Sequence, residues 1–288
     1  MKVARTPTEL GPGPRAVALG TFDGVHLGHR RVIETALAAG PEPTVVTFDP
    51  HPRTALGNRV ELLTSLDRRL ELLEQVGVEA TLVVEFTLDL ARLEPEQFAE
   101  EVLRPIGAEV VVAGEDFRFG RGRSGDLNLL GRLGFETRPA PILDGVSSSR
   151  IRELVATGDV EGAASLLGRP VEVEGTVVTG DARGGTLGFP TANLDVRPDL
   201  LVPANGIYAG TAAEHRAAVS IGTNPHYGGR ERRVEAHLLD FDGDIYGERL
   251  VVELWQRLRD EQAFDTEDDL VAQIARDVEA ARRAESPA

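Results

Sequence analysis

The chain has 288 residues, a formal net charge of −16 and no cysteine. This length suits two domains, each with its own core. The lack of cysteine excludes disulfides, thiolate catalysis and cysteine-bound metals, and the acidic balance disfavours nucleic acid as a partner. No apolar run approaches the ~20 residues that span a bilayer, and residues 1–14 have no signal-peptide core. We therefore expect a cytoplasmic protein without a membrane partner.

The first predicted unit is a strand, a glycine-rich turn and a helix. The apolar run Ala16–Leu19 predicts a buried strand, and apolar residues recur at helical spacing within residues 30–39. Between them stands Gly-Thr-Phe-Asp-Gly-Val-His-Leu-Gly-His, residues 20–29. The glycines let the backbone approach an anion, and the free N–H groups of the new helix point at it. The sequence therefore predicts a phosphate site here.

Two histidines of this turn, His26 and His29, indicate a kind of phosphate chemistry. They are three residues apart at the start of a helix, so both imidazoles can face one bound group. Hydrogen-bond donors aimed at oxygens that gain charge are worth roughly 3–4 kcal/mol each. Because the chain has no Gly-x-x-x-x-Gly-Lys-Ser/Thr loop, the pair indicates attack at the α-phosphate of a nucleotide. Surface histidines or metal ligands are the alternative that the pair alone leaves open.

A family resemblance starts at this turn and continues after the next predicted strand, Thr44–Phe48. His-x-Gly-His resembles the signature of a nucleotidyltransferase superfamily. Together with Thr-Phe-Asp-Pro-His-Pro at residues 47–52, the string resembles the bacterial bifunctional riboflavin kinase/FAD synthetases. His51 either lines the nucleotide pocket or is an ordinary loop residue. The resemblance implies catalytic roles for the two histidines of the turn and ATP contacts from Gly20, Phe22, Asp23, Gly24, His26 and His29.

Strands and helices go on alternating through the first half. Helices are predicted at residues 65–76 and 96–103, and strands at 81–86, 109–113 and 135–139. This order predicts a parallel sheet with helices on both faces. The resemblance implies the same fold class, an α/β nucleotidyltransferase with a Rossmann-like parallel sheet.

The loop at residues 114–123 contains three arginines, two phenylalanines and three glycines. An exposed pair of phenylalanines is costly unless it binds something. The composition therefore favours a flavin- or nucleotide-facing loop over a solvated basic loop. The resemblance implies that Asp116 and Phe117 lie near the adenine and the flavin phosphates.

Three serines followed by Arg-Ile-Arg, residues 147–152, mark the start of another helix. Capping explains one serine, but not three with two arginines, and the group predicts a second anion site. The stretch resembles the superfamily motif that holds the β- and γ-phosphates of ATP. The resemblance implies that Ser148, Ser149 and Arg152 make these contacts and steady the leaving pyrophosphate.

The pattern changes near Pro170, where helical periodicity gives way to short β runs. The runs and the final helix are predicted at residues 171–178, 206–211, 217–221, 234–241, 249–255 and 266–282. Asp242-Gly243 predicts a hairpin between the last two strands. The pattern predicts a small antiparallel barrel with a terminal helix packed on it. We expect an FMN adenylyltransferase domain at residues 1–168 and a riboflavin kinase domain at residues 169–288, the kinase barrel being implied by the resemblance.

A glycine-rich turn at residues 180–188 can bring backbone N–H groups onto phosphate oxygens. Thr191 and Asn193 follow in an extended segment, and their oxygens suit Mg²⁺ bound with ATP. Gly-Phe-Pro-Thr-Ala-Asn, residues 188–193, resembles the flavokinase signature, which implies ATP contacts from Gly180, Gly184, Gly188, Thr191 and Asn193. Two departures from the family pattern are Gly185, where arginine is usual and Arg183 is near enough to substitute, and Asn-Pro-His-Tyr at residues 224–227.

Phosphoryl transfer to an alcohol needs a group that accepts the proton. By its spacing Glu235 is an ordinary exposed strand residue that shares a face with His237 and Leu239. The string Val-Glu-x-His resembles the flavokinase motif. The resemblance implies that Glu235 is the base for the 5′-hydroxyl of riboflavin.

These motifs imply two ATP-using reactions on one chain. Riboflavin and MgATP would give FMN and ADP, and FMN with a second ATP would give FAD and pyrophosphate. Positioning and charge stabilisation suffice for both, without a covalent intermediate. The rival interpretations are a His-x-Gly-His transferase for another phosphorylated substrate with a regulatory second domain, and a flavin-storage protein. The expected partners are small molecules only, ATP, riboflavin and FMN, with the chain a monomer or a weak homo-oligomer.

Overall fold

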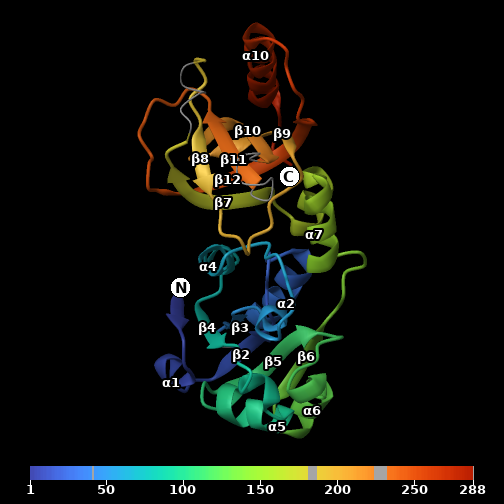
Figure 1. The fold of residues 1–288 in the computed structure, drawn as a ribbon. Helices are drawn as coiled ribbons and strands as arrows, with labels where there is room; N and C mark the ends of the chain where they lie inside the picture. The colour runs from blue at the N-terminus through green and yellow to red at the C-terminus, as the bar shows by residue number, and fades with distance from the viewer. Residues whose placement is uncertain (41, 181–186, 224–231, 288) are drawn as a thin grey trace. The chain divides into compact units, whose positions relative to one another are not determined.

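The computed structural model describes residues 1–40, 42–180, 187–223 and 232–287. The chain forms two compact units, Met1–Ser148 and Ser149–Ala288, which are traced along the chain in Figure 1. Within the described residues no helix is long and apolar enough to cross a membrane.

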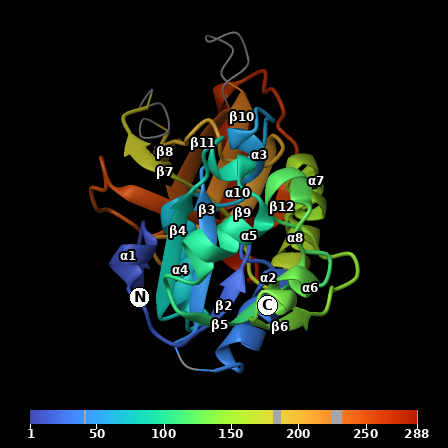
Figure 2. The ribbon, with the colours of Figure 1, turned by 90° about the horizontal axis from the view of Figure 1, so that it is seen from below.

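The first unit is built on a six-stranded sheet in the order β1-β4-β3-β2-β5-β6. Every neighbouring pair of strands is parallel, and several of the strands lie side by side in Figure 2. All five residues of β2 are buried, as expected for a parallel strand covered on both faces. The strands are β1 (Lys2–Ala4), β2 (Arg15–Leu19), β3 (Thr44–Asp49), β4 (Ala80–Glu85), β5 (Ala108–Gly114) and β6 (Glu136–Ala140).

Alternate residues of strands β2, β3 and β5 enter two separate cores. In β2, Val17 and Leu19 join the cluster that includes Phe98 and Leu130, whereas Ala16 and Ala18 join the cluster on the other face. Helices α1 (Pro7–Leu10), α5 (Pro95–Phe98) and α6 (Leu127–Arg132) supply the first cluster, and α2 (Leu27–Leu37) and α4 (Leu66–Gln75) supply the second. The predicted parallel sheet with helices on both faces is confirmed.

The strand order reverses direction at β2. Strands β3 and β4 continue on one side of β2, whereas β5 and β6 lie on the other side. In open sheets of this kind, ligands bind outside the carboxyl ends of the strands at the point of reversal. The turn at residues 20–29 follows β2, and the loop that begins at Glu115 follows β5. Both loops therefore lie at the position where this fold binds ligands.

Two helices differ from their predicted limits. Helix α2 begins at Leu27, three residues before the predicted start, because the side chain of His26 caps it. The helix predicted at residues 96–103 begins as α5 and continues as a π-helical segment, Ala99–Leu103. Short helices also follow β3 and β4, α3 (Pro52–Ala55) and the 3₁₀ turn Leu90–Arg92.

The second unit is a closed barrel in the order β10-β11-β8-β7-β12-β9, with all neighbours antiparallel. The predicted antiparallel barrel is therefore confirmed. The strands are β7 (Val171–Val178), β8 (Ala192–Asp195), β9 (Gly206–Ala212), β10 (His215–Thr223), β11 (Arg232–Leu238) and β12 (Arg249–Arg259). The predicted hairpin at Asp242-Gly243 is wrong, because β8 and β7 stand between β11 and β12. The connecting segment bonds to β7 instead, where Val177 donates to the carbonyl of Glu248 and accepts from Gly247.

Three helices accompany the barrel: α7 (Ser148–Thr157), α8 (Val160–Leu167) and the terminal α10 (Glu267–Arg283). Helix α8 packs on β7 and β12 and buries Val160, Ala163, Ala164 and Leu167. Helix α10 packs on β9 and β10. The division between compact units falls after Ser148, the first residue of α7, and ahead of α8, whereas the domain limits 1–168 and 169–288 stay a prediction.

Candidate functional sites

The turn after β2 has an uncommon backbone. Phe22, Gly24 and Val25 all have positive φ, at 52°, 83° and 39°. The side chains of Phe22 and Val25 are both 1% exposed and anchor the turn in the core, while Gly20 packs against the Phe22 ring. At Gly24 a Cβ would lie 2.7 Å from Cδ1 of Leu63. Strain of this kind persists only when surrounding contacts over-determine it, and it often marks a ligand site.

His26 fixes the start of helix α2 and also its own tautomer. Its Nδ1 accepts a hydrogen bond of 3.2 Å from the backbone N–H of His29. A neutral imidazole whose Nδ1 is an acceptor carries its proton on Nε2. The ring is 6% exposed. The cap therefore leaves Nε2 of His26 as a hydrogen-bond donor.

His29 lies parallel to His26. The two ring centroids are 3.6 Å apart and the planes differ by 16°. Phe22 meets His29 edge to face, with centroids 5.3 Å apart. The structure thus brings both predicted histidines together as one stacked pair held by the turn.

Asp23, inside this turn, is fully buried, with 0% exposure. Its carboxylate accepts hydrogen bonds from the backbone N–H groups of Leu63 at 3.0 Å and Thr64 at 3.2 Å. The hydroxyl of Thr64 accepts in turn from the N–H of Gly24 at 3.1 Å. These bonds tie the turn to residues 63–64, so Asp23 holds the turn in place. A contact between Asp23 and ATP stays a prediction.

Ser148, far along the chain, reaches the same turn. Its hydroxyl donates a hydrogen bond of 3.2 Å to the carbonyl oxygen of Asp23. Ser149 is exposed and Arg152 is partly exposed, and both belong to the second compact unit. On helix α7, Arg152 follows Ser148 by four residues, so the two lie on one helix face.

The loop after β5 differs from its predicted form. Phe119 is 8% exposed and belongs to the core beside Phe98. Phe117 is partly buried and stacks on Phe119, with centroids 5.8 Å apart. The expected exposed pair of phenylalanines is therefore wrong for Phe119, because local composition does not show which ring the core takes up. Asp116 is exposed, two residues after β5 ends.

A second set of predicted residues meets on the barrel, across strands β8 and β11. Asn193 and Glu235 are direct partners in the antiparallel ladder. The Thr191 hydroxyl donates to Oε2 of Glu235 over 3.5 Å, and Arg233 lies 3.3 Å from Oε1. Glu235 alternates with the buried residues Val234 and Ala236, so its side chain points away from the barrel interior.

His237 fixes the segment that precedes β8. Its Nδ1 lies 2.7 Å from the carbonyl oxygen of Pro190, and its ring meets Phe189 edge to face. His237 and Glu235 are thus on one face, as predicted. Leu239 is not on that face, because β11 ends at Leu238 and Leu239 is buried at 3% exposure.

Gly180 packs closely on Asn193. A Cβ at Gly180 would lie 2.3 Å from the Asn193 amide nitrogen, so a side chain at this position would displace the Asn193 amide. Gly188 has φ of 85°, a conformation that favours glycine. Arg183, Gly184, Gly185 and residues 224–227 lie outside the described residues.

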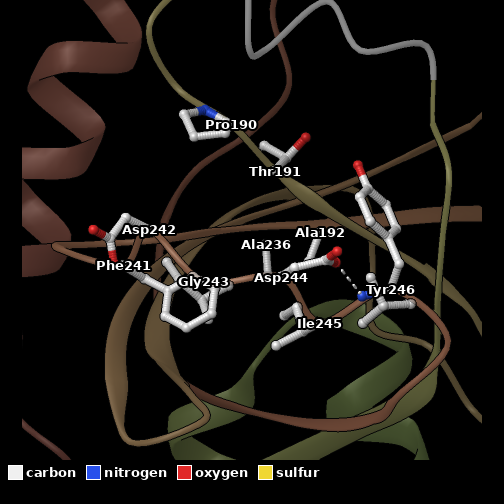
Figure 3. Close-up of a pocket in the computed structure, with 12 residues that line it drawn as sticks. Pro190, Thr191, Ala192, Ala236, Phe241, Asp242, Gly243, Asp244, Ile245 and Tyr246 are labelled. Atoms are coloured by element: carbon white, nitrogen blue, oxygen red, sulfur yellow. Dashed lines mark hydrogen bonds between the residues drawn. The ribbon is translucent and has the colours of Figure 1, made fainter.

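A pocket of about 220 Å³ opens beside Thr191. Figure 3 shows the rings of Phe241 and Tyr246 flanking the small side chains of Ala192 and Ala236. Half of its wall comes from residues 241–246, where Asp244 accepts a hydrogen bond from the backbone N–H of Tyr246. Sequence reasoning missed this wall because Asp242-Gly243 was taken only as a turn. The two aromatic residues of Phe-Asp-Gly-Asp-Ile-Tyr, residues 241–246, were the available signal.

The arrangement defines a class before any relative is considered: a two-part enzyme that uses nucleotides, with a Rossmann-ordered sheet followed by a barrel. Residues 11–143 match the family model for FAD synthetase, and residues 167–285 match the one for riboflavin kinase, or flavokinase. A bifunctional riboflavin kinase/FMN adenylyltransferase of Listeria monocytogenes is 37% identical, covering 91% of this chain and 90% of the relative. The Escherichia coli protein of the same name is 36% identical, covering 98% and 97%.

Among solved structures, a Streptococcus pneumoniae chain described as a macrolide-efflux protein is similar over 98% of this chain and 99% of its own length. The TM-score is 0.88 and the identity is 32%. The present chain belongs to the family of bifunctional riboflavin kinases/FMN adenylyltransferases. It phosphorylates riboflavin to FMN and converts FMN to FAD.

Proposed function

We propose that FAD is made at the turn of residues 20–29 and FMN on the face of β8 and β11. The observation that carries the first assignment is the stacked pair of His26 and His29 at the reversal point of the sheet. The second rests on the ladder pairing of Asn193 with Glu235. The two reactions are those of the family. The stacked histidines and the Asn193–Glu235 pair support the proposed location of each reaction.

At the first site, a phosphate oxygen of FMN attacks the α-phosphorus of ATP, and the bond to the pyrophosphate oxygen breaks. The phosphate of FMN is already ionised near pH 7, so no base is needed. His26, through Nε2, and His29 donate to the oxygens that gain charge. Further ATP contacts come from Gly20, Phe22, Gly24 and Ser148 of the first unit, while the ATP contacts of Ser149 and Arg152 stay predictions from the sequence. Asp116 and Phe117 face the FMN, while Asp23 acts mainly by holding the turn.

At the second site, Glu235 takes the proton of the riboflavin 5′-hydroxyl as its oxygen attacks the γ-phosphorus of ATP. Thr191 and Asn193 offer a hydroxyl and an amide oxygen next to this carboxylate, a donor set that fits Mg²⁺. The metal, arriving with ATP, would neutralise charge on the phosphates. Backbone groups around Gly180 and Gly188 cradle the phosphates, while the predicted contact of Gly184 lies outside the described residues.

The pocket beside Thr191 is proposed for the adenine ring of this ATP. Its wall carries the aromatic rings of Phe241 and Tyr246, and flat apolar walls with few polar groups are typical of ring-binding sites. Thr191 lines the same pocket. A ring bound there would therefore place its attached phosphates near the proposed metal ligands.

Magnesium dependence tests the donor set. Within the described residues, no group of three His, Cys, Asp or Glu side chains could hold a metal ion, so Mg²⁺ should bind weakly without ATP. We expect EDTA to stop FMN formation and added Mg²⁺ to restore it. A stoichiometric, chelator-resistant metal in the purified protein would contradict this proposal.

The decisive experiment separates the two roles of His26, the helix cap through Nδ1 and the hydrogen-bond donor at Nε2. Asparagine is a good N-cap but is too short to place a donor where Nε2 stands. His26→Asn should keep the folded stability and lose about 10²–10³ in the rate of FAD formation from FMN. His26→Ala, the matched control, should lose the same activity and about 1 kcal/mol of stability as well. Full activity in His26→Asn would refute the donor role.

A further inference from the structure

Arg69, on helix α4, is the largest side chain among the fully buried residues that the structure describes, with 1% exposure. It shares a helix face with Leu73, four residues later, which is also buried. An apolar side chain would satisfy this position by packing alone. A buried cation is costly unless it is paired and hydrogen-bonded, so the charge needs another explanation.

The guanidinium is bonded to the end of strand β3. Nη1 donates to the carbonyl oxygen of Phe48 at 3.1 Å and lies 3.5 Å from the hydroxyl of Thr47. Within the described residues, Nε and Nη2 have no hydrogen-bond partner. The two contacts of Nη1 therefore satisfy only part of the hydrogen-bonding capacity of the buried guanidinium.

Two carboxylates provide its counter-charge. Burial lowers the pKa of Arg69, and the negative charges of Asp23 and Asp49 oppose that change. Asp23 is fully buried, whereas the Asp49 side chain is 40% exposed and has Arg5 at 4.0 Å. The buried negative charge of Asp23 therefore needs the opposite charge of Arg69 more than the partly solvated charge of Asp49 does.

One contact of Arg69, with Thr47, and one opposite charge, that of Asp23, lead to the turn that carries the histidines. The Thr47 hydroxyl donates a hydrogen bond of 2.9 Å to the carbonyl oxygen of Thr21. Asp23 is itself part of the turn and binds Leu63 and Thr64. Helix α4 is thereby connected to the turn by one hydrogen-bond path and one pair of opposite charges.

We propose that Arg69 is a positioning residue for FAD synthesis, which holds the turn of residues 20–29 in its strained shape through its contact with Thr47 and through its charge, opposite to that of buried Asp23. With 1% exposure it does not touch substrate. The inference rests on the proposed location of FAD synthesis at this turn. If that location is wrong, His26→Asn stays active, so this failure is separate from a failure of Arg69.

The test compares Arg69→Met, Asp23→Asn and the double variant. Removing one member of a buried pair leaves the other charge uncompensated, whereas removing both does not. Since small misplacements of catalytic groups cost up to 10²-fold, Arg69→Met should lower kcat for FAD formation by about that factor. The double variant should recover much of the loss. The riboflavin kinase activity of the same preparations, which should not change, reports intact protein.

Two further variants complete the test. Arg69→Met with Asp49→Asn is the matched control, and it should recover less activity because Asp49 is partly solvated. Arg69→Lys keeps the charge and should retain more activity than Arg69→Met. If Arg69 serves only for packing, methionine will equal or exceed lysine and the losses in the Asp23 double variant will multiply. Either result overturns the proposal, and if Arg69→Met fails to fold, the lysine variant and the Asp23 double variant still decide it.

Discussion

The two proposed sites bind the same nucleotide with different parts of the chain. The first uses a turn with three positive φ angles, and its histidines are placed by a helix cap and by stacking. The second uses side chains of paired antiparallel strands, which are partly exposed. A strand pair fixes its side chains by register alone, whereas a turn needs supporting contacts beneath it. Remote substitutions should therefore disturb the first site more than the second.

The largest expected effect is on the barrel. Glu235→Gln keeps the size and hydrogen bonding of the side chain but cannot take a proton, so FMN formation should fall by about 10²–10⁴. Flavin and MgATP binding should change little, because the amide still fills the same place. Rapid-quench assays of FMN with equilibrium binding would measure both. Turnover near the parent rate would make Glu235 a structural strand residue.

His29→Ala should have the opposite selectivity to Glu235→Gln, because it should lower FAD formation and spare FMN formation. It removes one donor at the turn, and FAD formation from FMN should fall by about 10²–10³. FMN formation from riboflavin should persist, because the kinase residues lie on the barrel. Chromatography of both products from one preparation gives the comparison. Equal loss of both reactions in a folded variant would exclude two separate sites.

Truncation tests where the kinase unit begins. Fragment 169–288 contains the barrel, Glu235 and α10, and we expect it to phosphorylate riboflavin without making FAD. Fragment 149–288 also keeps α8, whose Val160 and Leu167 are buried. Each such side chain contributes about 1.5–3 kcal/mol, so the longer fragment should have the higher thermal midpoint. Equal midpoints would place α8 outside the kinase unit.

The sequence predicted what is local and missed what depends on distant partners. The run at Val171–Val178 predicted β7 to the residue, and the histidine motif indicated its strand-to-helix turn. The hairpin at Asp242-Gly243 failed because barrel closure, which turn chemistry does not encode, places β8 and β7 between the two strands. Arg69 was assigned only to a helix, since periodicity does not show that a charged residue turns inward toward Asp23 and Asp49.

The smallest expected effect concerns the pocket wall that precedes β12. Asp240, with φ of 57°, comes directly before Phe241 of the pocket. Arg282 of helix α10 bonds both of its carboxylate oxygens, at 2.6 and 3.0 Å. The hydrogen bond from Arg282 lowers the pKa of Asp240 below its ordinary value. The pair therefore contributes stability above the ordinary pKa of an aspartate, about 4, and loses it as the pH falls through the lowered value.

Arg282→Gln should accordingly lower kinase stability near neutral pH, and the difference from the parent should shrink below about pH 4 and vanish as the pH falls through the lowered pKa of Asp240. Because exposed ion pairs are weak and screened by salt, the KM for ATP should rise only slightly and less at high salt. Arg283→Gln is the matched control, since Arg283 pairs with Glu279 inside the same helix and not with the pocket wall. Thermal unfolding at several pH values and ATP titrations of FMN formation measure both effects. If the two variants have the same KM for ATP, the ion pair does not position the wall; if only Arg282→Gln raises it, the terminal helix supports nucleotide binding through Asp240.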